Sequence, residues 1–483
     1  MKKHLKKRVV MQNRYLCLHA HFYQPPRENP WLEEIEVEES AYPFHDWNER
    51  ITKECYHPNA HARILDAKGQ ITEIVNNYSR ISYNFGPTVL SWMERKAPKT
   101  YNAILTSDKK SQQRFSGHGS ALAQCYNHII MPLANRRDKE TQVKWGIADF
   151  QKRFARDPEG MWLPETAVDE ETLDILAKHH IKFTILAPHQ VKSVRKIGKS
   201  KWKDISGGRI DPRRPYLCNL PTGRSIVLFF YDGPVSQSIA FDGLLADGAR
   251  LANKLMGCFS NGEDHHKQAK DNPHYIPELV HVATDGETYG HHHKFGDMAL
   301  AYCLNNITKN NLAELTIYAE FLENFPPIEE VKIIENTSWS CIHGIERWRS
   351  NCGCHTGARE GWHQKWRQPL RDSLNELRDH MSLVYEQKAK RWLQDPWQTR
   401  NDYIDVILNR SEGTVTKFLQ EQGLDFLSLE DKTKIIRLLE MQRNSMLMFT
   451  SCGWFFNDIS GLETTQILKY AARAIQLLEN FTS

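Results

Sequence analysis

The chain has 483 residues, 40% of them hydrophobic and 25% charged, which is typical of a globular protein and excludes a wholly disordered or fibrous chain. Its net charge of +4 is far below the basic excess of a dedicated nucleic-acid-binding protein. No stretch approaches the roughly 18 uninterrupted apolar residues of a membrane-spanning helix. Neither nucleic acid nor a membrane is therefore an expected partner.

The N-terminal segment Met1–Arg8 resembles the basic region of a signal peptide, but polar residues follow soon after it, from Gln12 onward. We therefore expect no export and a cytoplasmic location. The ten cysteines are spread along the chain and fit reduced thiols in such a compartment. Cys125 and Cys303 stand in apolar segments and are expected to be core residues.

Short apolar runs alternate with amphipathic segments from Arg14 onward. Strands are predicted at 15–18, 80–83, 182–186, 225–230 and 279–282, and helices at 60–77, 144–156 and 172–177. Strands separated by helices favour parallel pairing with right-handed crossovers, which makes an α/β barrel the expected fold. The basic stretch 192–214 is predicted to be a loop, and the polar stretch 261–272 a mobile insertion.

The character of the sequence changes after about residue 335. Long helical periodicity appears at 370–392, 432–448 and 465–478, with few strand-like runs. The chain is therefore predicted to hold a barrel domain over residues 1–335 and a mainly helical domain over residues 336–483.

Acidic side chains stand in two separate segments, one of which directly follows a predicted strand and also carries histidines. The segment Thr284–His293 places Asp285 and Glu287 directly after one strand, and Glu165 follows Pro164 shortly before a predicted helix. Barrels gather their chemistry at the C-terminal ends of strands, so the two segments are predicted to form one active site. Two carboxyl groups about 5 Å apart suit retaining glycoside hydrolysis, and a gap of roughly 6.5 to 9.5 Å suits inversion.

Four motifs in order carry a resemblance to a known family: His19–Pro26, His118–His128, Trp162–Glu165 and Asp285–Gly290. With these motifs, residues 14 to about 335 resemble glycoside hydrolase family 57. The region beyond resembles the uncharacterised domain that follows the catalytic part in one branch of that family. The resemblance implies a distorted (β/α)7 barrel followed by a C-terminal helical domain. It also implies an amylase-like glycosidase or transglycosylase that acts on α-glucans with retention.

The motif match implies that Glu165 is the nucleophile and Asp285 the acid/base. In a double displacement, an ionised carboxylate attacks the anomeric carbon and a protonated carboxyl donates to the leaving oxygen. Asp285 should then have a pKa raised by burial or by a neighbouring negative charge, for which Glu287 is the candidate. No cofactor is expected.

Further residues are candidates for contact with an oligo- or polysaccharide. His19 and His21 share one face of a strand and suit hydrogen bonds to sugar hydroxyls, as does Glu287. The motif match implies that His128 contacts the reacting sugar. Trp162 is expected either to stack on a pyranose ring or to be part of the core.

The segment Ser338–His355 has no counterpart in the better-known amylolytic members of the family. We expect it to be a loop that closes over the sugar site. In that interpretation Trp339 and Trp348 offer stacking surfaces and Arg347 binds a hydroxyl. Likewise His21 and Gln24 are separated by two aromatic residues where many members have a compact His-Gln-Pro, which leaves the substrate open.

A zinc site is an alternative for part of this segment. Cys341, Cys352, Cys354 and His355 are suitable ligands, but their spacing fits no standard structural zinc motif. The prediction is therefore that the protein holds no metal.

Two other functions compete. In a metal-dependent polysaccharide hydrolase or deacetylase, a divalent ion would be held by His19, His21, Asp285 and one or more of His291–His293, which leaves Glu165 without a role. A non-catalytic glucan-binding protein is the third interpretation. The sugar, the linkage, the choice between hydrolysis and transfer, and the oligomeric state stay open.

Overall fold

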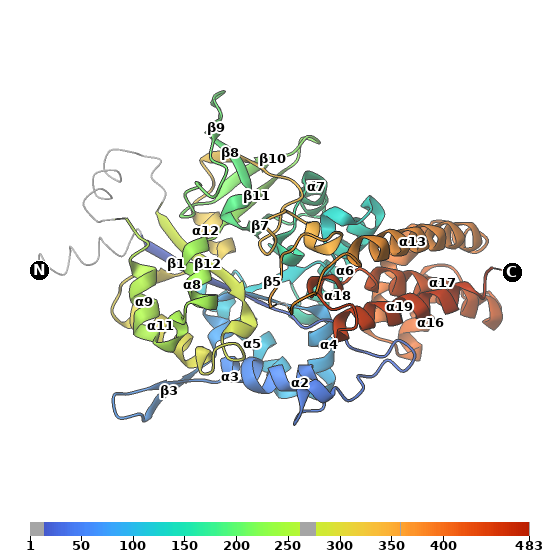
Figure 1. Cartoon of the computed structure of the whole chain (residues 1–483), viewed down its shortest axis with the longest axis horizontal. Coiled ribbons are helices and arrows are strands. Elements are labelled where there is room, and N and C mark those ends of the chain that lie inside the picture. The colour runs from blue at the N-terminus through green and yellow to red at the C-terminus, as the bar shows by residue number, and fades with distance from the viewer. Residues whose placement is uncertain (1–13, 261–276, 358, 483) are drawn as a thin grey trace, which may run out of the picture.

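The computed structural model describes residues 14–260, 277–357 and 359–482 (Figure 1). The basic N-terminal segment Met1–Arg8 and the insertion expected at 261–272 lie outside the described residues. In the part that is described, no helix is both long and apolar enough to cross a bilayer.

Seven parallel strands form a curled sheet in the described part of the chain. They run in the order β12-β1-β4-β5-β6, an isolated parallel bridge between Gly160 and Phe183 joins β6 to β7, and β7 pairs with β11. The Asp232 N–H donates to the His281 carbonyl over 2.9 Å and so joins the segment after β11 to β12. This arrangement confirms the predicted distorted (β/α)7 barrel. The strands are β1 (Arg14–Phe22), β4 (Ser82–Phe85), β5 (Ala121–Gln124), β6 (Met161–Trp162), β7 (Phe183–Leu186), β11 (Ser225–Phe230) and β12 (Glu278–Asp285).

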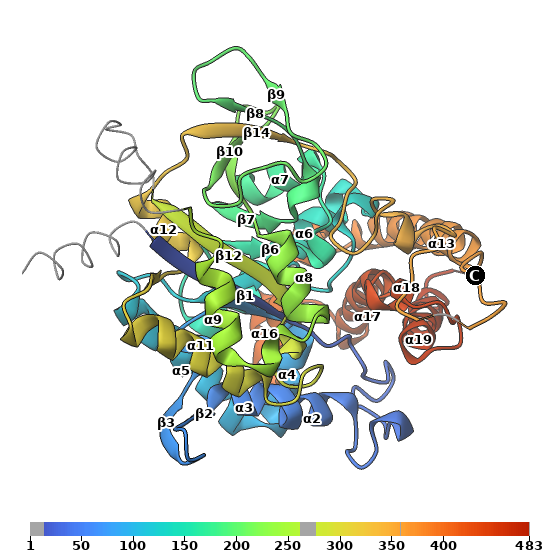
Figure 2. The ribbon, with the colours of Figure 1, turned by 60° about the vertical axis from the view of Figure 1, so that its left-hand side comes forward.

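Helices cover the outside of this sheet, as the two views show (Figures 1 and 2). Side-chain caps start several of them: Asn135 accepts from the Asp138 N–H at the start of α6, and Asp169 from the Thr172 N–H at the start of α7. The helices predicted at 144–156 and 172–177 are confirmed as parts of these two. The helices of the barrel region are α2 (Trp47–Ile51), α3 (His57–Ala60), α4 (Pro87–Lys96), α5 (Pro98–Arg114), α6 (Arg136–Phe154), α7 (Glu170–Lys178), α8 (Gly233–Phe241), α9 (Gly248–Met256), α11 (Gly296–Lys309) and α12 (Tyr318–Asn324).

A second, mixed sheet extends from β11. Its further strands are β10 (Tyr216–Asn219), β14 (Glu329–Ile333), β8 (Val191–Lys196) and β9 (Lys203–Asp204), and the short β13 (Glu314–Leu315) pairs with β1. The prediction of a loop over 192–214 is wrong where β8 and β9 form. β8 pairs antiparallel with β14 and with β9, and Arg195 of β8 donates to Glu330 of β14 over 2.7 Å.

The helix predicted at 60–77 is also wrong. This segment contains an antiparallel hairpin of β2 (Ala62–Leu65) and β3 (Ile71–Val75). The residues of the turn between the two strands favour the hairpin. The Asp66 carboxylate accepts from the N–H groups of Lys68 and Gln70, and Gly69 has a φ of +76°. The apolar spacing of this short segment is compatible with either structure, and the turn selects the hairpin.

The C-terminal region is helical, as predicted, and its long helices lie at one end of the molecule (Figure 1). Met381, Tyr385, Ile435 and Leu438 belong to its hydrophobic core. Whether it forms a domain of its own from residue 336 stays a prediction. The helices are α13 (Arg367–Ala389), α14 (Pro396–Asp402), α15 (Ile404–Leu408), α16 (Glu412–Glu421), α17 (Leu429–Leu447), α18 (Cys452–Phe455) and α19 (Leu462–Leu478).

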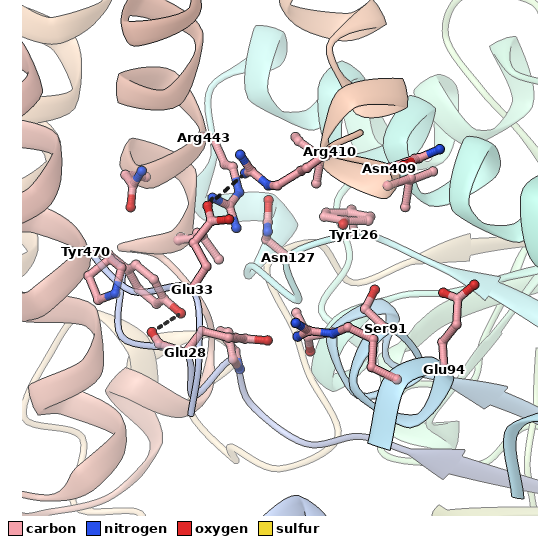
Figure 3. Close-up of a pocket in the computed structure, with 18 of the residues that line it drawn as sticks. Glu28, Glu33, Ser91, Glu94, Tyr126, Asn127, Asn409, Arg410, Arg443 and Tyr470 are labelled. Atoms are coloured by element: carbon pink, nitrogen blue, oxygen red, sulfur yellow. Dashed lines mark hydrogen bonds and ion pairs between the residues drawn. The ribbon is translucent and has the colours of Figure 1, made fainter. Parts of the chain in front are cut away.

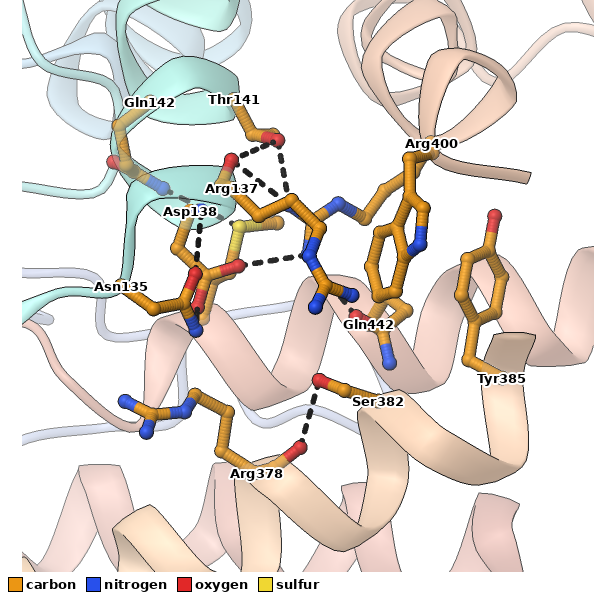
Figure 4. Close-up of polar contacts among 12 residues, drawn as sticks. Asn135, Arg137, Asp138, Thr141, Gln142, Arg378, Ser382, Tyr385, Arg400 and Gln442 are labelled. Carbon is orange, nitrogen blue, oxygen red and sulfur yellow. Dashed lines mark hydrogen bonds and ion pairs between the residues drawn. The ribbon is translucent and has the colours of Figure 1, made fainter. Parts of the chain in front are cut away.

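A buried ion pair joins the helical region to the barrel (Figure 4). The Arg400 guanidinium of α14 donates to Asp138 of α6 over 2.8 Å, and also to Thr141 and Gln442. Both charged side chains are at most 8% exposed. Because a buried charge is costly without partners, this network ties the helices closely to the barrel wall.

Candidate active site

The predicted site residues of the barrel lie at or just beyond the C-terminal ends of its strands. Asn84 at the end of β4 is their polar centre: its amide contacts both His19 and His21 of β1 and donates to Gln124 at the end of β5 over 2.8 Å. All four side chains are buried. Parallel strands end at the same edge of the sheet, which brings these residues together.

His19 is fully enclosed at the base of the site. One ring nitrogen hydrogen-bonds Ser82 Oγ over 3.0 Å and the other Asn84 Oδ1 over 3.1 Å. A sugar hydroxyl would have to displace one of these partners. The predicted sugar contact of His19 therefore stays a prediction. In this structure the side chain forms part of the wall of the site.

His21 and His128 face each other with their Nε2 atoms 3.2 Å apart. The second ring nitrogen of His128 hydrogen-bonds Ser451 Oγ of the C-terminal region over 2.6 Å. Burial lowers the pKa of His21 to about 3 and that of His128 well below its usual value, so both imidazoles are neutral. Tyr23 stacks on His128 with ring centroids 3.7 Å apart.

Trp162 lies beneath these rings. It is 0% exposed and stacks on His19 and His21 at centroid distances of 4.9 Å. Trp162 was predicted either to stack on a sugar or to be part of the core, and in this structure it is a core residue. It forms no open stacking wall, because the histidines and Trp339 cover the indole. Contact with a sugar would require one of these covering rings to move.

Glu165 sits on a sharply turned backbone. Its φ of 58° and ψ of 19° are left-handed, a conformation that costs a non-glycine residue free energy and is common at functional sites. Its Oε2 accepts from Trp339 Nε1–H over 2.9 Å and from Ser340 Oγ–H over 2.6 Å. Burial raises the pKa of Glu165, while these two hydrogen bonds and the charge of Arg347 oppose the rise.

The surroundings of Asp285 differ from those of Glu165. It is the last residue of β12, and its side chain is exposed to solvent although many protein atoms lie around the carboxyl group. Desolvation, followed by the negative charge of Glu165, raises the pKa of Asp285 to about 7. The charge was expected at Glu287, and the structure places it instead at Glu165.

Glu287 is buried behind the site. Its Oε1 accepts from the Tyr23 backbone N–H over 3.0 Å and from Tyr56 Oη–H over 2.6 Å. Burial is the main reason that its pKa rises to about 8, and the charge of Asp285 adds to the effect. Its predicted contact with sugar stays a prediction.

The segment Ser338–His355 reaches the site as expected, but its aromatic residues differ in position. Trp339 is partly exposed and holds Glu165, whereas Trp348 is fully buried and offers no stacking surface. That part of the prediction is wrong. Arg347 is also buried, with its guanidinium 4.0 Å from the Phe455 ring centroid. Its charge acts on Glu165, and its contact with a sugar hydroxyl stays a prediction.

One cluster of possible metal ligands occurs in the described residues: Cys341, His343, Cys352 and Cys354. It differs from the set considered from sequence by His343 in place of His355. The ion site of a metal-dependent hydrolase is not assembled among the described residues. His291 instead contacts Glu54, and His293 contacts the Ala240 carbonyl oxygen.

A cavity of about 630 Å³ lies at the junction of the barrel and the helical region (Figure 3). Tyr126 and Asn127 line it from the barrel, and Arg410 and Arg443 line it from the helical region. Both arginines contact Glu33 at distances of 3.2 and 3.4 Å. Neither Glu165 nor Asp285 lines this cavity, which therefore lies apart from the two carboxyl groups.

Sequence reasoning missed several residues that shape the site. Gln124 ends β5 and could have been noticed as a polar residue at a strand end. Asn84 is recognisable from the sequence as a polar residue after the strand predicted at 80–83, but its contacts with the two histidines are not. Ser340 stands between the two singled-out residues Trp339 and Cys341. Ser451 lies in the helical region, and no pattern in the sequence connects it to His128.

Comparison with known proteins agrees with this architecture. Residues 14–334 match the family Glycosyl hydrolase family 57, and residues 362–483 match a domain of unknown function, DUF3536. No match was found among curated proteins.

Several solved structures share the fold. An exo-type maltose-forming amylase from Pyrococcus sp. ST04 superposes with a TM-score of 0.74 at 18% identity, over 97% of this chain and 80% of that one. A branching enzyme of family 57 from Pyrococcus horikoshii has a TM-score of 0.57 at 16% identity, over 97% and 89%. An α-amylase from Thermotoga maritima has a TM-score of 0.54 at 12% identity, over 98% and 94%. Since the family match spans more than half of the sequence, the chain belongs to glycosyl hydrolase family 57.

Proposed function

We propose that this protein cleaves or transfers α-glucans with retention of configuration, with Glu165 as nucleophile and Asp285 as acid/base. One observation carries the proposal: two carboxyl groups of one site have contrasting surroundings. Glu165 accepts two hydrogen bonds that favour its ionised form, whereas Asp285 has a pKa of about 7. Such a pair can divide the roles of nucleophile and acid at neutral pH.

The chemistry follows from these protonation states. The Glu165 carboxylate attacks the anomeric carbon while the Asp285 carboxyl donates its proton to the departing glycosidic oxygen. Once the covalent glycosyl-enzyme has formed, Asp285 is ionised and takes a proton from the incoming water or sugar hydroxyl. That acceptor then displaces Glu165, and two inversions give net retention.

The proposed class of carbohydrate substrate is inferred from solved structures with the same fold. The solved structures that share this fold include a maltose-forming amylase, an α-amylase and a 4-α-glucanotransferase. His21 and His128 carry neutral imidazoles, and a sugar hydroxyl that bound either ring would replace one of its present partners. We infer an uncharged α-linked glucan as the substrate.

The test uses maltooligosaccharides and an activated α-glucosyl substrate such as the fluoride. Proton NMR should show that the first product keeps the α configuration. Asp285→Ala should lose about 10²- to 10⁴-fold in turnover of unactivated substrate. Azide should restore turnover of the fluoride by Glu165→Ala with a β-glycosyl azide product, because azide attacks opposite the leaving group.

Glu376→Gln and Asp242→Asn are matched controls, since both side chains are exposed and both should keep full turnover. An initial β product, or full turnover by both Glu165→Ala and Asp285→Ala, would contradict the proposed mechanism. Activity that needed an added divalent ion after chelator treatment and was insensitive to Glu165→Ala would instead support the metal-dependent alternative.

A further inference from the structure

Three thiols and one imidazole converge beside the active site, in a part of the chain that the proposed mechanism does not use. Cys341, His343, Cys352 and Cys354 each direct one ligand atom into a common space, with all four atoms within 4.8 Å of one another. None of the three cysteines is in a disulfide. Four mutually facing donors of this kind are the ligand set of a structural zinc site.

The distances agree with tetrahedral coordination. Zinc–sulfur bonds of about 2.3 Å and zinc–nitrogen bonds of about 2.0 to 2.1 Å place tetrahedral ligand atoms roughly 3.8 Å apart for two sulfurs and roughly 3.6 Å for sulfur and nitrogen. Cys341 Sγ lies 4.0 Å from Cys352 Sγ and 3.8 Å from Cys354 Sγ. Cys354 Sγ lies 3.5 Å from His343 Nδ1. A disulfide would need about 2.05 Å.

The loop around these residues is built to hold them. Gly353, with a φ of +83°, turns the chain sharply between Cys352 and Cys354. The side chain of Gln364 accepts from the Gly353 N–H over 3.0 Å and donates to the Cys354 carbonyl over 2.7 Å. Outer hydrogen bonds of this kind orient the ligands of metal sites.

A buried positive charge faces the cluster. Arg367 is 0% exposed, and its Nη1 lies 3.9 Å from Cys352 Sγ while Nη2 donates to two backbone carbonyls. In the described ranges 14–260, 277–357 and 359–482, no carboxylate forms an ion pair with it. A buried guanidinium needs a counter-charge. One zinc ion with three thiolates and a neutral imidazole carries a net charge of −1, which supplies it.

We propose that Cys341, His343, Cys352 and Cys354 bind one structural zinc ion. All four ligands come from the protein, so the site is closed and holds no position for substrate. The ion would fix the segment that also carries Trp339 and Ser340, the two hydrogen-bond donors of Glu165. The metal site itself does not depend on the proposed function.

The first test measures metal in the full-length protein, purified without chelator and exchanged into metal-free buffer. Mass spectrometry should find about one zinc ion per chain, as expected for one structural site. Modification of the thiols should release this zinc to a colorimetric chelator without any substitution. Cobalt loaded in place of zinc should give thiolate-to-cobalt charge-transfer bands and the strong visible bands of tetrahedral geometry.

Variants assign the ligands. The double variant Cys352→Ser with Cys354→Ser should lose the zinc and the charge-transfer bands, and His343→Ala should weaken binding strongly. His355→Ala is the matched control, because this neighbouring histidine lies outside the cluster and its loss should change nothing.

The proposal is overturned if wild-type protein carries no zinc and gives no cobalt–thiolate bands, or if the double cysteine variant binds as wild type does. Loss of zinc with His355→Ala and not with His343→Ala would also overturn it. Because metal content and spectra are read independently of turnover, failure of the glucan mechanism would leave this test intact.

Discussion

Trp339 holds both the side chain and the backbone of Glu165. Its indole N–H donates to Oε2 over 2.9 Å, and its backbone N–H donates to the Glu165 carbonyl oxygen over 3.0 Å. The two residues are 174 positions apart in the chain. The segment that follows the barrel's last strands therefore orients the proposed nucleophile, and the barrel alone does not complete the site.

Ser340→Ala should weaken catalysis. It removes the hydroxyl that donates to Glu165 Oε2 over 2.6 Å, and a hydrogen bond to a charged group contributes about 1.5 to 3 kcal/mol. We expect kcat/KM to fall roughly 10- to 100-fold. The acid limb of the pH profile should also move to higher pH, because the ionised form of Glu165 loses a donor.

Ser350→Ala is the matched control for this experiment. Ser350 belongs to the same segment, but its hydroxyl donates to the Glu346 carbonyl over 3.3 Å, away from Glu165. An unshifted acid limb in Ser340→Ala, or an equal loss of activity in both variants, would show that the hydroxyl does not act on the nucleophile.

The pH dependence of kcat/KM should be bell-shaped. Glu165 must be ionised to attack, so the rate falls as the pH drops through its raised pKa. Asp285 must be protonated to donate, so the rate falls again as the pH rises above about 7. A profile that stays flat from pH 6 to pH 9 would exclude Asp285 as the acid.

Replacement of Glu165 should lower the pKa of Asp285. The charge of Glu165 is one of the two causes that raise this pKa to about 7, and Glu165→Gln removes the charge at nearly constant shape. Titration of ¹³C-labelled aspartate by NMR should therefore show Asp285 ionising at lower pH in the variant. Asp242→Asn, which alters an exposed residue, should leave the Asp285 titration unchanged.

Much of this fold is readable from local sequence patterns. Buried parallel strands such as 225–230 are continuous apolar runs, and the long C-terminal helices have strong periodicity, so both were predicted correctly. The hairpin at 62–75 was missed because a short amphipathic segment is ambiguous and its turn residues decided the structure. β5 and β6, with four residues and two residues, are too short to give a pattern.

The candidate site is likewise only partly predictable from the sequence. Asp285 stands next to a predictable strand, so its place at the barrel mouth follows from the sequence. The contacts of Trp339 and Ser340 with Glu165, and of Ser451 with His128, join segments far apart in the chain. Periodicity and spacing carry no information about such tertiary contacts. The environment of each carboxyl group is therefore visible only in the structure.

Arg400→Ala should destabilise the protein strongly. It leaves Asp138 buried without its 2.8 Å ion-pair partner at the junction of α6 and α14, and breaking such a pair costs about 3 to 5 kcal/mol. Urea unfolding should show a loss of this size. Lys434→Ala breaks an exposed pair with Glu430 and should cost less than about 0.5 kcal/mol. Equal losses would mean that the buried network adds no stability.

Removal of zinc from the proposed metal site should lower the catalytic rate more than substrate affinity. Cys341 follows directly after Ser340, so a released loop frees both donors of Glu165, while His21 and His128 remain held by β1 and by Ser451. In chelator-treated wild-type protein kcat should fall with little change in KM, and the acid limb should move to higher pH. Added zinc should restore both in wild type and neither in the double variant Cys352→Ser with Cys354→Ser. A metal-free protein with unchanged kcat would show that the loop keeps its shape without the ion, because the hydrogen bonds of Gln364 suffice to hold it.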